Sequence, residues 1–314
     1  MADVRREPKC AWVTLVFVNE NELYATGAAV LAASLKSVNT KYPLVLMYNG
    51  LSDATIEWLR GFYDELIEVP LIEAKSAKLH SAKQQGVYGS WIDRSYTKWN
   101  CTNPEIIHYD KIMLLDADCM FVKNCDELFE LHAPAGVLSN PWAYPFAKRH
   151  GMYNPYMKRD GNHNVPPRHG DAISVEELSV GLRCSFVAPA CNVLIEPSKV
   201  LYEQICQLLR DNVPYGNTRC ISGMDEQVLA EATIKLNLQW TMIHQCYGWI
   251  VGKTDWCKEE DAKLWQWYSS KPWTSKRGEW SDLNRWYAHW DQIYRDTDVP
   301  VALRVATLRS AARG

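Results

Sequence analysis

The chain has 314 residues, of which 47% are hydrophobic and 23% are charged. This composition is typical of a globular protein with one large domain or two small ones. The formal net charge of -3 and the lack of a basic run exclude a general nucleic-acid binder. No stretch approaches the ~20 consecutive apolar residues of a membrane span.

The cysteines and the first residues indicate a compartment. None of the ten cysteines forms a Cys-x-x-Cys pair, so a zinc knuckle is not expected. Several lie in apolar runs, which predicts buried free thiols in a reducing environment. Residues 1–9 are polar and lack the apolar core of a signal peptide. We therefore expect a cytoplasmic protein without a membrane span.

The first 70 residues alternate between strand and helix patterns. Each predicted strand is rich in β-branched or large apolar residues, and the first predicted helix has one apolar stripe. This alternation predicts right-handed crossovers, a parallel sheet and a ligand outside the carboxyl ends of its strands. The predicted strands are 12–18, 44–48 and 65–69, and the predicted helices are 25–38 and 54–63.

The run 111–122 carries Asp116 and Asp118 inside an otherwise apolar sequence. We interpret it as a buried strand with the aspartates where the strand emerges, because a buried carboxylate without a partner costs several kcal/mol. Residues i and i+2 of a strand point to the same side, so one cation could contact both carboxylates. Taken alone, the Asp-x-Asp triplet favours a surface turn after a strand, and the apolar approach makes a functional site about equally plausible.

Phosphate-binding loops of the usual kinds are missing. There is no Gly-x-Gly-x-x-Gly after the first strand and no Gly-Lys-Ser/Thr loop. A nucleotide diphosphate held at this sheet would need another device to neutralise its charge. A divalent metal on Asp116 and Asp118 would serve.

The second half of the chain is less regular. Periodicity disappears over 141–183, which we interpret as a lid, a binding loop or a disordered segment. Apolar and helical patterns return between 186 and 230. Eight of the fourteen tryptophans lie between Trp249 and Trp290, in a tail predicted to be irregular. Most are expected to anchor the core, and a minority could stack on sugars.

Several separate segments resemble the glycosyltransferases of family 8, the retaining group that includes glycogenin and galactinol synthase. The order and spacing of these segments agree from about residue 11 to 290. They are the first strand with Asn21, Tyr24 and the following helix, Leu114-Leu115-Asp116-Ala117-Asp118, Leu194-Ile195-Glu196-Pro197-Ser198, Asp225-Glu226-Gln227, and Lys271-Pro272-Trp273.

This resemblance implies an α/β fold of the GT-A type, a Rossmann-like, mostly parallel sheet with flanking helices that binds a nucleotide sugar. It implies a single domain over residues 1–314. A nucleotide-binding half would cover 11–131, an acceptor and catalytic half 132–296 with the loop 141–183, and a tail 297–314. The loop and the tryptophan-rich segment would form the acceptor walls.

The resemblance also implies roles for particular residues. Asp116 and Asp118 would hold Mn²⁺, with Mg²⁺ as an alternative. Asp225, Glu226 and Gln227 would lie near the reacting sugar carbon. The donor-binding positions correspond to Val18, Asn21, Tyr24, Lys98, Asn192 and Lys271.

Two positions depart from the family pattern. The family's third metal ligand, a His five or six residues before Lys-Pro-Trp, falls here near Trp265 or Gln266. The amide oxygen of Gln266 can ligate a hard cation without contributing charge. His244 is the other candidate ligand, if the loop takes a different path. Asn192 lies out of step with the family's Asn-Ala-Gly.

The expected function is retaining transfer of a hexose from a UDP-sugar, UDP-glucose or UDP-galactose, to a hydroxyl of a carbohydrate, polyol or protein acceptor. Retention would follow from a covalent intermediate or from attack on the leaving-group face. One alternative is a nucleotide-sugar-binding protein of the same fold with weakened catalysis. Another is a sugar-phosphate nucleotidyltransferase, whose Gly-rich basic loop is missing here. Self-glycosylation and a homodimer are left open.

Overall fold

The central feature of the computed structural model is an eight-stranded sheet with the order β3-β2-β1-β4-β10-β6-β11-β9. Strands β3, β2, β1 and β4 are parallel, β10 is antiparallel to both of its neighbours, and β6 pairs in parallel with β11. The expected α/β class with a mostly parallel sheet is confirmed. The structure describes residues 7–19, 21–78, 85–86, 89–138, 158–160, 163–165, 167–183, 188, 191–216, 223–252, 257–268, 270–278 and 281–304.

The first three predicted strands and two predicted helices are present within a few residues of their expected bounds. The strands of the central sheet are β1 Cys10–Phe17, β2 Leu44–Asn49, β3 Glu65–Glu68, β4 Lys111–Leu115, β6 Ala135–Gly136, β9 Ala172–Ile173, β10 Val193–Ile195 and β11 Trp240–Met242.

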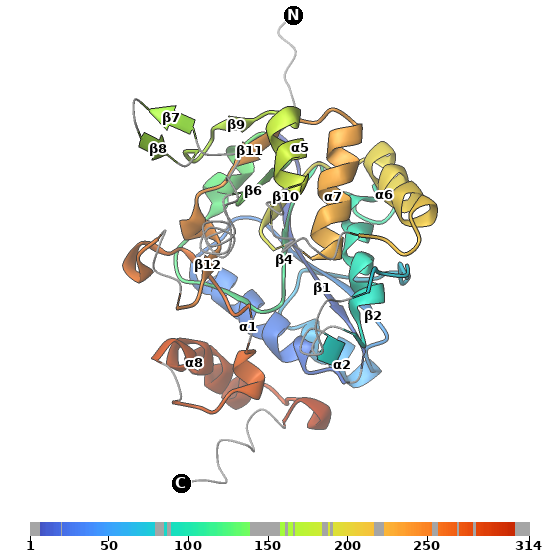
Figure 1. Cartoon of the computed structure of the whole chain (residues 1–314). Coiled ribbons are helices and arrows are strands. Elements are labelled where there is room, and N and C mark those ends of the chain that lie inside the picture. The colour runs from blue at the N-terminus through green and yellow to red at the C-terminus, as the bar shows by residue number, and fades with distance from the viewer. Residues whose placement is uncertain are drawn as a thin grey trace, which may run out of the picture.

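Both faces of the sheet are buried. Along β1, Trp12 and Val16 belong to one apolar core and Ala11 and Val13 to the other, as the alternation of side chains along a strand requires. Helices α1 (Tyr24–Ser37), α2 (Asp53–Leu59) and α8 (Ser281–Asp296) contribute to the first core. Helices α5 (Val175–Arg183), α6 (Lys199–Asp211) and α7 (Met224–Lys235) contribute to the second (Figure 1).

The run 111–122 is two strands rather than one. β4 ends at Leu115, a turn follows, and β5 (Cys119–Phe121) joins a separate three-stranded sheet with β13 (Leu264–Gln266) and β12 (Trp249–Ile250). The prediction of a single strand is therefore wrong, because the apolar residues of β5 are buried in the second sheet and not in the central one. Asp116 and Asp118 lie in the turn between the two sheets.

Two predictions of irregular structure are also wrong in part. Within the loop predicted over 141–183, the structure has the hairpin β7 (Lys158–Asp160) and β8 (His163–Val165), strand β9 and helix α5, whereas residues 141–157 lie outside the described residues. The tail predicted to be irregular contains α8, whose buried residues Leu283, Trp286, Trp290 and Ile293 are spaced three or four apart. Aromatic residues at helical spacing carry this stripe.

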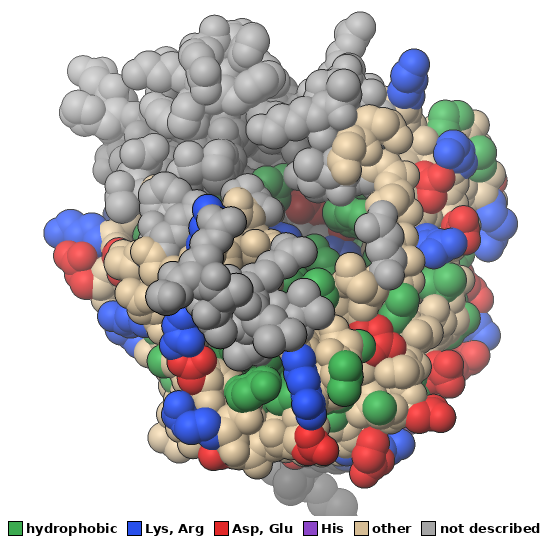
Figure 2. Space-filling view, turned by 90° about the horizontal axis from the view of Figure 1, so that it is seen from below, with side chains coloured by type: hydrophobic (Ala, Val, Ile, Leu, Met, Phe, Trp, Pro, Cys, Tyr) green, Lys and Arg blue, Asp and Glu red, His purple; other side chains and the backbone are tan. Residues whose placement is uncertain are grey.

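Short 3₁₀ helices connect the main elements. They are η1 Ile92–Thr102, η2 Asp126–Glu130, η3 Gln245–Tyr247, η4 Glu259–Asp261, η5 Pro272–Thr274 and η6 Val301–Leu303. On the face of the molecule shown in Figure 2, acidic and basic side chains are interspersed. Within the part of the chain that the structure describes, none of the helices combines the length and apolar character that a bilayer crossing requires.

Candidate active site

The turn that carries Asp116 and Asp118 lies at the carboxyl edge of the parallel strands. Leu115, the last residue of β4, is paired with Thr14 of β1, and the hydroxyl of Thr14 donates a hydrogen bond to the carbonyl of Leu115 at 2.7 Å. The backbone N–H of Cys119 donates to the carbonyl of Asp116 at 3.2 Å. These bonds hold both ends of the turn.

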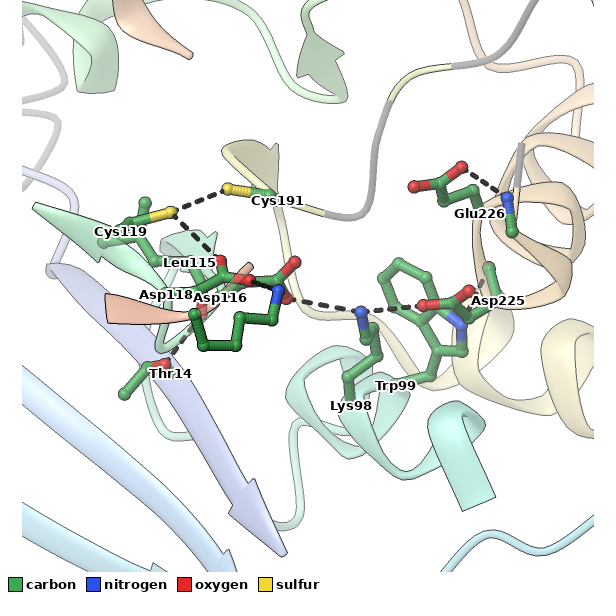
Figure 3. A network of polar contacts seen from close by, with 12 residues as sticks. Thr14, Lys98, Trp99, Leu115, Asp116, Asp118, Cys119, Cys191, Asp225 and Glu226 are labelled. Atoms are coloured by element: carbon green, nitrogen blue, oxygen red, sulfur yellow. Dashed lines mark hydrogen bonds and ion pairs between the residues drawn. The ribbon is translucent and has the colours of Figure 1, made fainter. Parts of the chain in front are cut away.

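Lys98 connects the aspartate turn to helix α7. Its Nζ lies 3.3 Å from Oδ1 of Asp116 and 2.7 Å from Oδ2 of Asp225 (Figure 3). The neighbouring Trp99 donates its indole N–H to the carbonyl of Asp225 at 3.1 Å. Element η1 therefore holds Asp225 in two ways: Lys98 pairs with its carboxylate, and Trp99 bonds to its backbone carbonyl.

Lys271 pairs with the other aspartate of the turn. Its Nζ forms an ion pair with Asp118, whose side chain is only 7% exposed. The same ammonium donates to the carbonyls of Trp267 at 2.9 Å and Tyr268 at 3.1 Å. The N–H of Trp267 in turn donates to the carbonyl of Asp118 at 3.1 Å. The segment before η5 is thus bound to the turn through backbone and side chain.

The charges of this network stabilise one another. Burial raises the pKa of Asp118, an effect that Lys271 opposes. Burial disfavours the ammonium of Lys98, but Asp116 and Asp225 outweigh it and raise the pKa of this lysine. The pKa of Lys271 is likewise raised against burial, chiefly by Asp118. Both lysines are therefore cationic at neutral pH.

The three predicted catalytic residues occupy the first turn of α7 and have different environments. Asp225 is bound to Lys98. Glu226 accepts a hydrogen bond from the backbone N–H of Gly223 at 2.7 Å, as in a capping box. Gln227 is buried, with its amide nitrogen 3.6 Å from the sulfur of Met224. The cap role of Glu226 leaves Asp225 and Gln227 as the stronger candidates for contact with a sugar.

The residues after β1 lie beside the network. Tyr24 is 39% exposed, and its ring packs edge-on against Trp273 with centroids 5.0 Å apart. Lys271 and Asp118 both act on the pKa of Tyr24, so this tyrosine lies close to their ion pair. Asn21 accepts a hydrogen bond from the N–H of Leu23 at 3.0 Å. Val18 is half-buried at the end of β1, where its N–H donates to the carbonyl of Asn49.

The two candidates for a third metal ligand have different surroundings. Gln266 is buried in β13 and pairs directly with Cys119 of β5, the residue that follows Asp118. His244 has other partners. Its backbone N–H donates to Nδ1 of His169 at 3.3 Å, and its own Nδ1 accepts a hydrogen bond from the backbone N–H of Cys246. The strand register favours Gln266 over His244 as a neighbour of the turn.

Asn192 lies at the same edge, just before β10. Its backbone N–H donates to the carbonyl of Leu114 at 2.8 Å, and its side-chain amide donates to the carbonyl of Tyr247. Its φ of 62° lies in the left-handed region that asparagine tolerates better than most residues. Its buried side-chain oxygen accepts no hydrogen bond from any residue in the described part of the chain.

The residues present fit a hard divalent cation. Asp116 and Asp118 offer only oxygen donors, which Mn²⁺ and Mg²⁺ accept, and Gln266 on the strand paired with Cys119 carries a further candidate amide oxygen. Among the described residues, no group of three or more His, Cys, Asp or Glu side chains is arranged to hold a metal. This donor set suits a cation that is completed by substrate phosphates and water rather than by a protein cage.

Sequence reasoning missed several residues that shape the site. Trp99 and Thr14 hold their neighbours through bonds that depend on pairing across the fold. A Cβ on Gly27 would overlap the carbonyl oxygen of Ala117 and the ring of Trp273. Gly27 belongs to the segment that resembles the family, but the reason for a glycine appears only in the packed structure.

Comparison with known proteins finds relatives by sequence and solved structures with a similar fold. No protein-family model matches the chain. It is 31% identical over 150 residues to glycogenin-1 of Oryctolagus cuniculus, which is 47% of this chain and 42% of that protein. It is 27% identical over 144 residues to UDP-glucuronate:xylan alpha-glucuronosyltransferase 2 of Arabidopsis thaliana, covering 46% of this chain and 22% of that protein.

A third relative is an uncharacterized protein of Acanthamoeba polyphaga mimivirus, 31% identical over 205 residues, or 62% of this chain and 58% of that protein. The chain thus spans 58% or less of the length of these three relatives.

Solved structures share the fold at low sequence identity. The galactosyltransferase LgtC, in complex with donor and acceptor sugar analogs, matches 94% of this chain and 99% of its own with a TM-score of 0.56 and 15% identity. The WbbM bifunctional glycosyltransferase matches 98% of this chain and 53% of its own with a TM-score of 0.58 and 13% identity. The expected GT-A fold is confirmed.

Proposed function

We propose, from the relationship of this chain to the glycosyltransferases of family 8, that it is a retaining, metal-dependent glycosyltransferase. It would transfer a hexose from a UDP-sugar to an acceptor hydroxyl. The observation that carries this proposal is the network at the carboxyl edge of the sheet, where Asp116, Asp118 and Asp225 are paired with two partly buried lysines. This is the edge at which α/β sheets bind ligands.

The proposed leaving group is a nucleoside diphosphate, so the site must stabilise negative charge as the glycosidic bond breaks. Lys271 lies at Asp118 and keeps its positive charge in a partly buried position. Asp116 and Asp118, with Gln266 as a neutral neighbour, would hold Mn²⁺ or Mg²⁺. When bound, the cation supplies Lewis-acid neutralisation of the diphosphate.

The sugar carbon develops oxocarbenium-like charge, which a carbonyl or carboxylate oxygen can stabilise. Asp225 is held by Lys98 and Trp99 at the start of α7, and Gln227 is buried on the same turn. This arrangement supports a role for these two residues at the sugar. Retention is compatible with a covalent intermediate or with attack on the leaving-group face.

The proposal also covers the sugar donor and the cellular compartment of the protein. UDP-glucose and UDP-galactose are the proposed donors, with a carbohydrate, polyol or protein acceptor. The eight cysteines of the described residues are all free thiols, which supports a reducing compartment such as the cytoplasm.

The proposal is tested by UDP release. Purified protein is incubated with UDP-glucose or UDP-galactose and Mn²⁺, with and without a chelator, while mass spectrometry of the protein detects self-glycosylation. We expect release that requires the metal and is lost in Asp118→Asn. Asp298→Asn is the matched control, because the Asp298 side chain is 97% exposed and forms a surface ion pair with Arg304.

A second candidate is a nucleotide-sugar-binding protein with weakened catalysis. The donor set favours it, since the described residues hold no cluster of three charged or imidazole ligands. UDP binding in calorimetry without turnover, insensitive to Asp118→Asn, would establish this alternative. Absence of both UDP binding and UDP release would reject the proposed function.

A further inference from the structure

Two thiols lie against the aspartate turn and have no part in the function proposed above. The Sγ atoms of Cys119 and Cys191 are 3.1 Å apart, and both residues are buried (Figure 3). Cys119 opens β5 directly after Asp118, and Cys191 stands just before β10, 72 residues along the chain. A disulfide bond is about 2.05 Å long, so the two sulfurs need to approach by about 1 Å to form one.

We propose that Cys119 and Cys191 are an oxidisable dithiol that hydrogen peroxide converts to a disulfide across the aspartate turn. One sulfur attacks an oxygen of the peroxide, the O–O bond breaks, and a sulfenic acid and one water result. The second sulfur then attacks the first, the S–S bond forms, the S–O bond breaks, and a second water leaves. Two thiols are oxidised and one peroxide is reduced to two waters.

Proximity selects this pair. Among the cysteines of the described residues, only these two have sulfur atoms in contact with each other. Cys206, which is less buried, interacts with Tyr202, and among the described cysteines none has its sulfur in contact with that of Cys206. Burial slows the first step at Cys119 and Cys191, but the neighbouring sulfur then captures the sulfenic acid in an intramolecular step.

The disulfide would act on the candidate metal site. The thiol of Cys119 is a weak donor 3.9 Å from Oδ1 of Asp118, and oxidation removes this donor. The N–H of Asn192 is bonded to the carbonyl of Leu114, so a shift of Cys191 also pulls on the end of β4. Oxidation therefore weakens cation and nucleotide binding at Asp118, a consequence that rests on the proposed function.

The pair is tested by mass spectrometry of the intact, folded chain. The protein is treated with hydrogen peroxide, its remaining thiols are alkylated, and it is digested with trypsin. We expect a cross-link between the peptide of Cys119 and the peptide of Cys191 that disappears after reduction. The Cys191 peptide also contains Cys184, so Cys184→Ser must retain the cross-link.

Both Cys119→Ser and Cys191→Ser must lose the cross-link, and Cys206→Ser must retain it. Formation of the cross-link in Cys191→Ser would overturn the proposal. Wild-type protein in which both thiols survive peroxide, or are oxidised only to sulfinic acid, would overturn it as well.

Calorimetry with UDP and Mn²⁺ separates this inference from the proposed function. We expect oxidised wild type to bind UDP at least about tenfold more weakly, with recovery on reduction. Cys191→Ser should be insensitive to peroxide. Reduced protein that binds no UDP would reject the proposed function while the cross-link stands. Unchanged affinity after complete cross-linking would reject the effect on Asp118.

Discussion

Two lysines determine the charge balance of the candidate site. Lys98 is shared between Asp116 and Asp225, and Lys271 is bound to Asp118 and two carbonyl groups. The carboxylates compensate the cost of burying each ammonium, and the lysines do the same for the carboxylates. Removing one partner leaves a buried charge without compensation.

Replacing Lys98 with Met should destabilise the protein by about 3 kcal/mol, because Asp225, with an 11% exposed side chain, then lacks its cation. The free energy of unfolding is measured by urea denaturation. Lys75→Met is the matched control, since Lys75 is 70% exposed in its pair with Asp93 and should cost at most about 1 kcal/mol. Equal losses in the two variants would contradict the assignment of Lys98 as the cation that compensates the buried Asp225.

Helix α1 meets the aspartate turn and η5 at one glycine. Gly27 faces the carbonyl of Ala117, which lies between the two aspartates, and the ring of Trp273. Trp273 in turn contacts Tyr24 at the start of the helix. Three elements from distant parts of the chain therefore depend on the absence of one Cβ.

Gly27→Ala should reduce the free energy of unfolding by about 1–3 kcal/mol through overpacking. It should also weaken Mn²⁺-dependent UDP binding, because relief of the overlap moves the carbonyl of Ala117. Urea denaturation measures the free energy of unfolding, and calorimetry measures the binding of UDP. Gly61→Ala serves as control, since its Cβ would lie 3.4 Å from the nearest atom, the carbonyl oxygen of Trp58. An unchanged variant at position 27 would show that the helix can shift without cost.

The whole molecule brings the site together from separate parts. The turn follows β4, Asp225 begins α7 on one face of the sheet, and Lys271 precedes η5, which packs with α1 and α8 of the other core (Figures 1 and 3). A ligand that contacts all three segments binds only the folded chain. Its binding free energy then adds to the stability of the fold.

UDP and Mn²⁺ together should raise the melting temperature by more than the sum of their separate effects. At a UDP concentration a hundredfold above its dissociation constant, the gain in stability should be about 2.7 kcal/mol. Differential scanning calorimetry measures the shift, and Asp118→Asn should remove the joint part of it. If UDP raises the melting temperature equally with and without metal, the result would contradict a metal-assisted diphosphate site.

The sequence by itself determined the elements with a local repeat and the chemistry of their ends. Alternating strand and helix patterns predicted β1 to β3, α1 and α2, and the apolar run predicted a buried approach to Asp116 and Asp118. These patterns are local, because a strand or helix reveals itself over a few neighbouring residues. The break of that run into two sheets, and helices α5 and α8, were not predicted.

Only the tertiary structure decided which side chains meet. Trp99 bonds to Asp225 across 126 residues and Lys271 reaches Asp118 across 153. The contact of Cys119 with Cys191 and the position of Gln266 opposite Cys119 depend on strand register. No local pattern encodes such contacts, because they arise from the packing of elements that are far apart in the chain. The Asp-x-Asp pair was visible in the sequence, and its lysine partners were assigned by the fold.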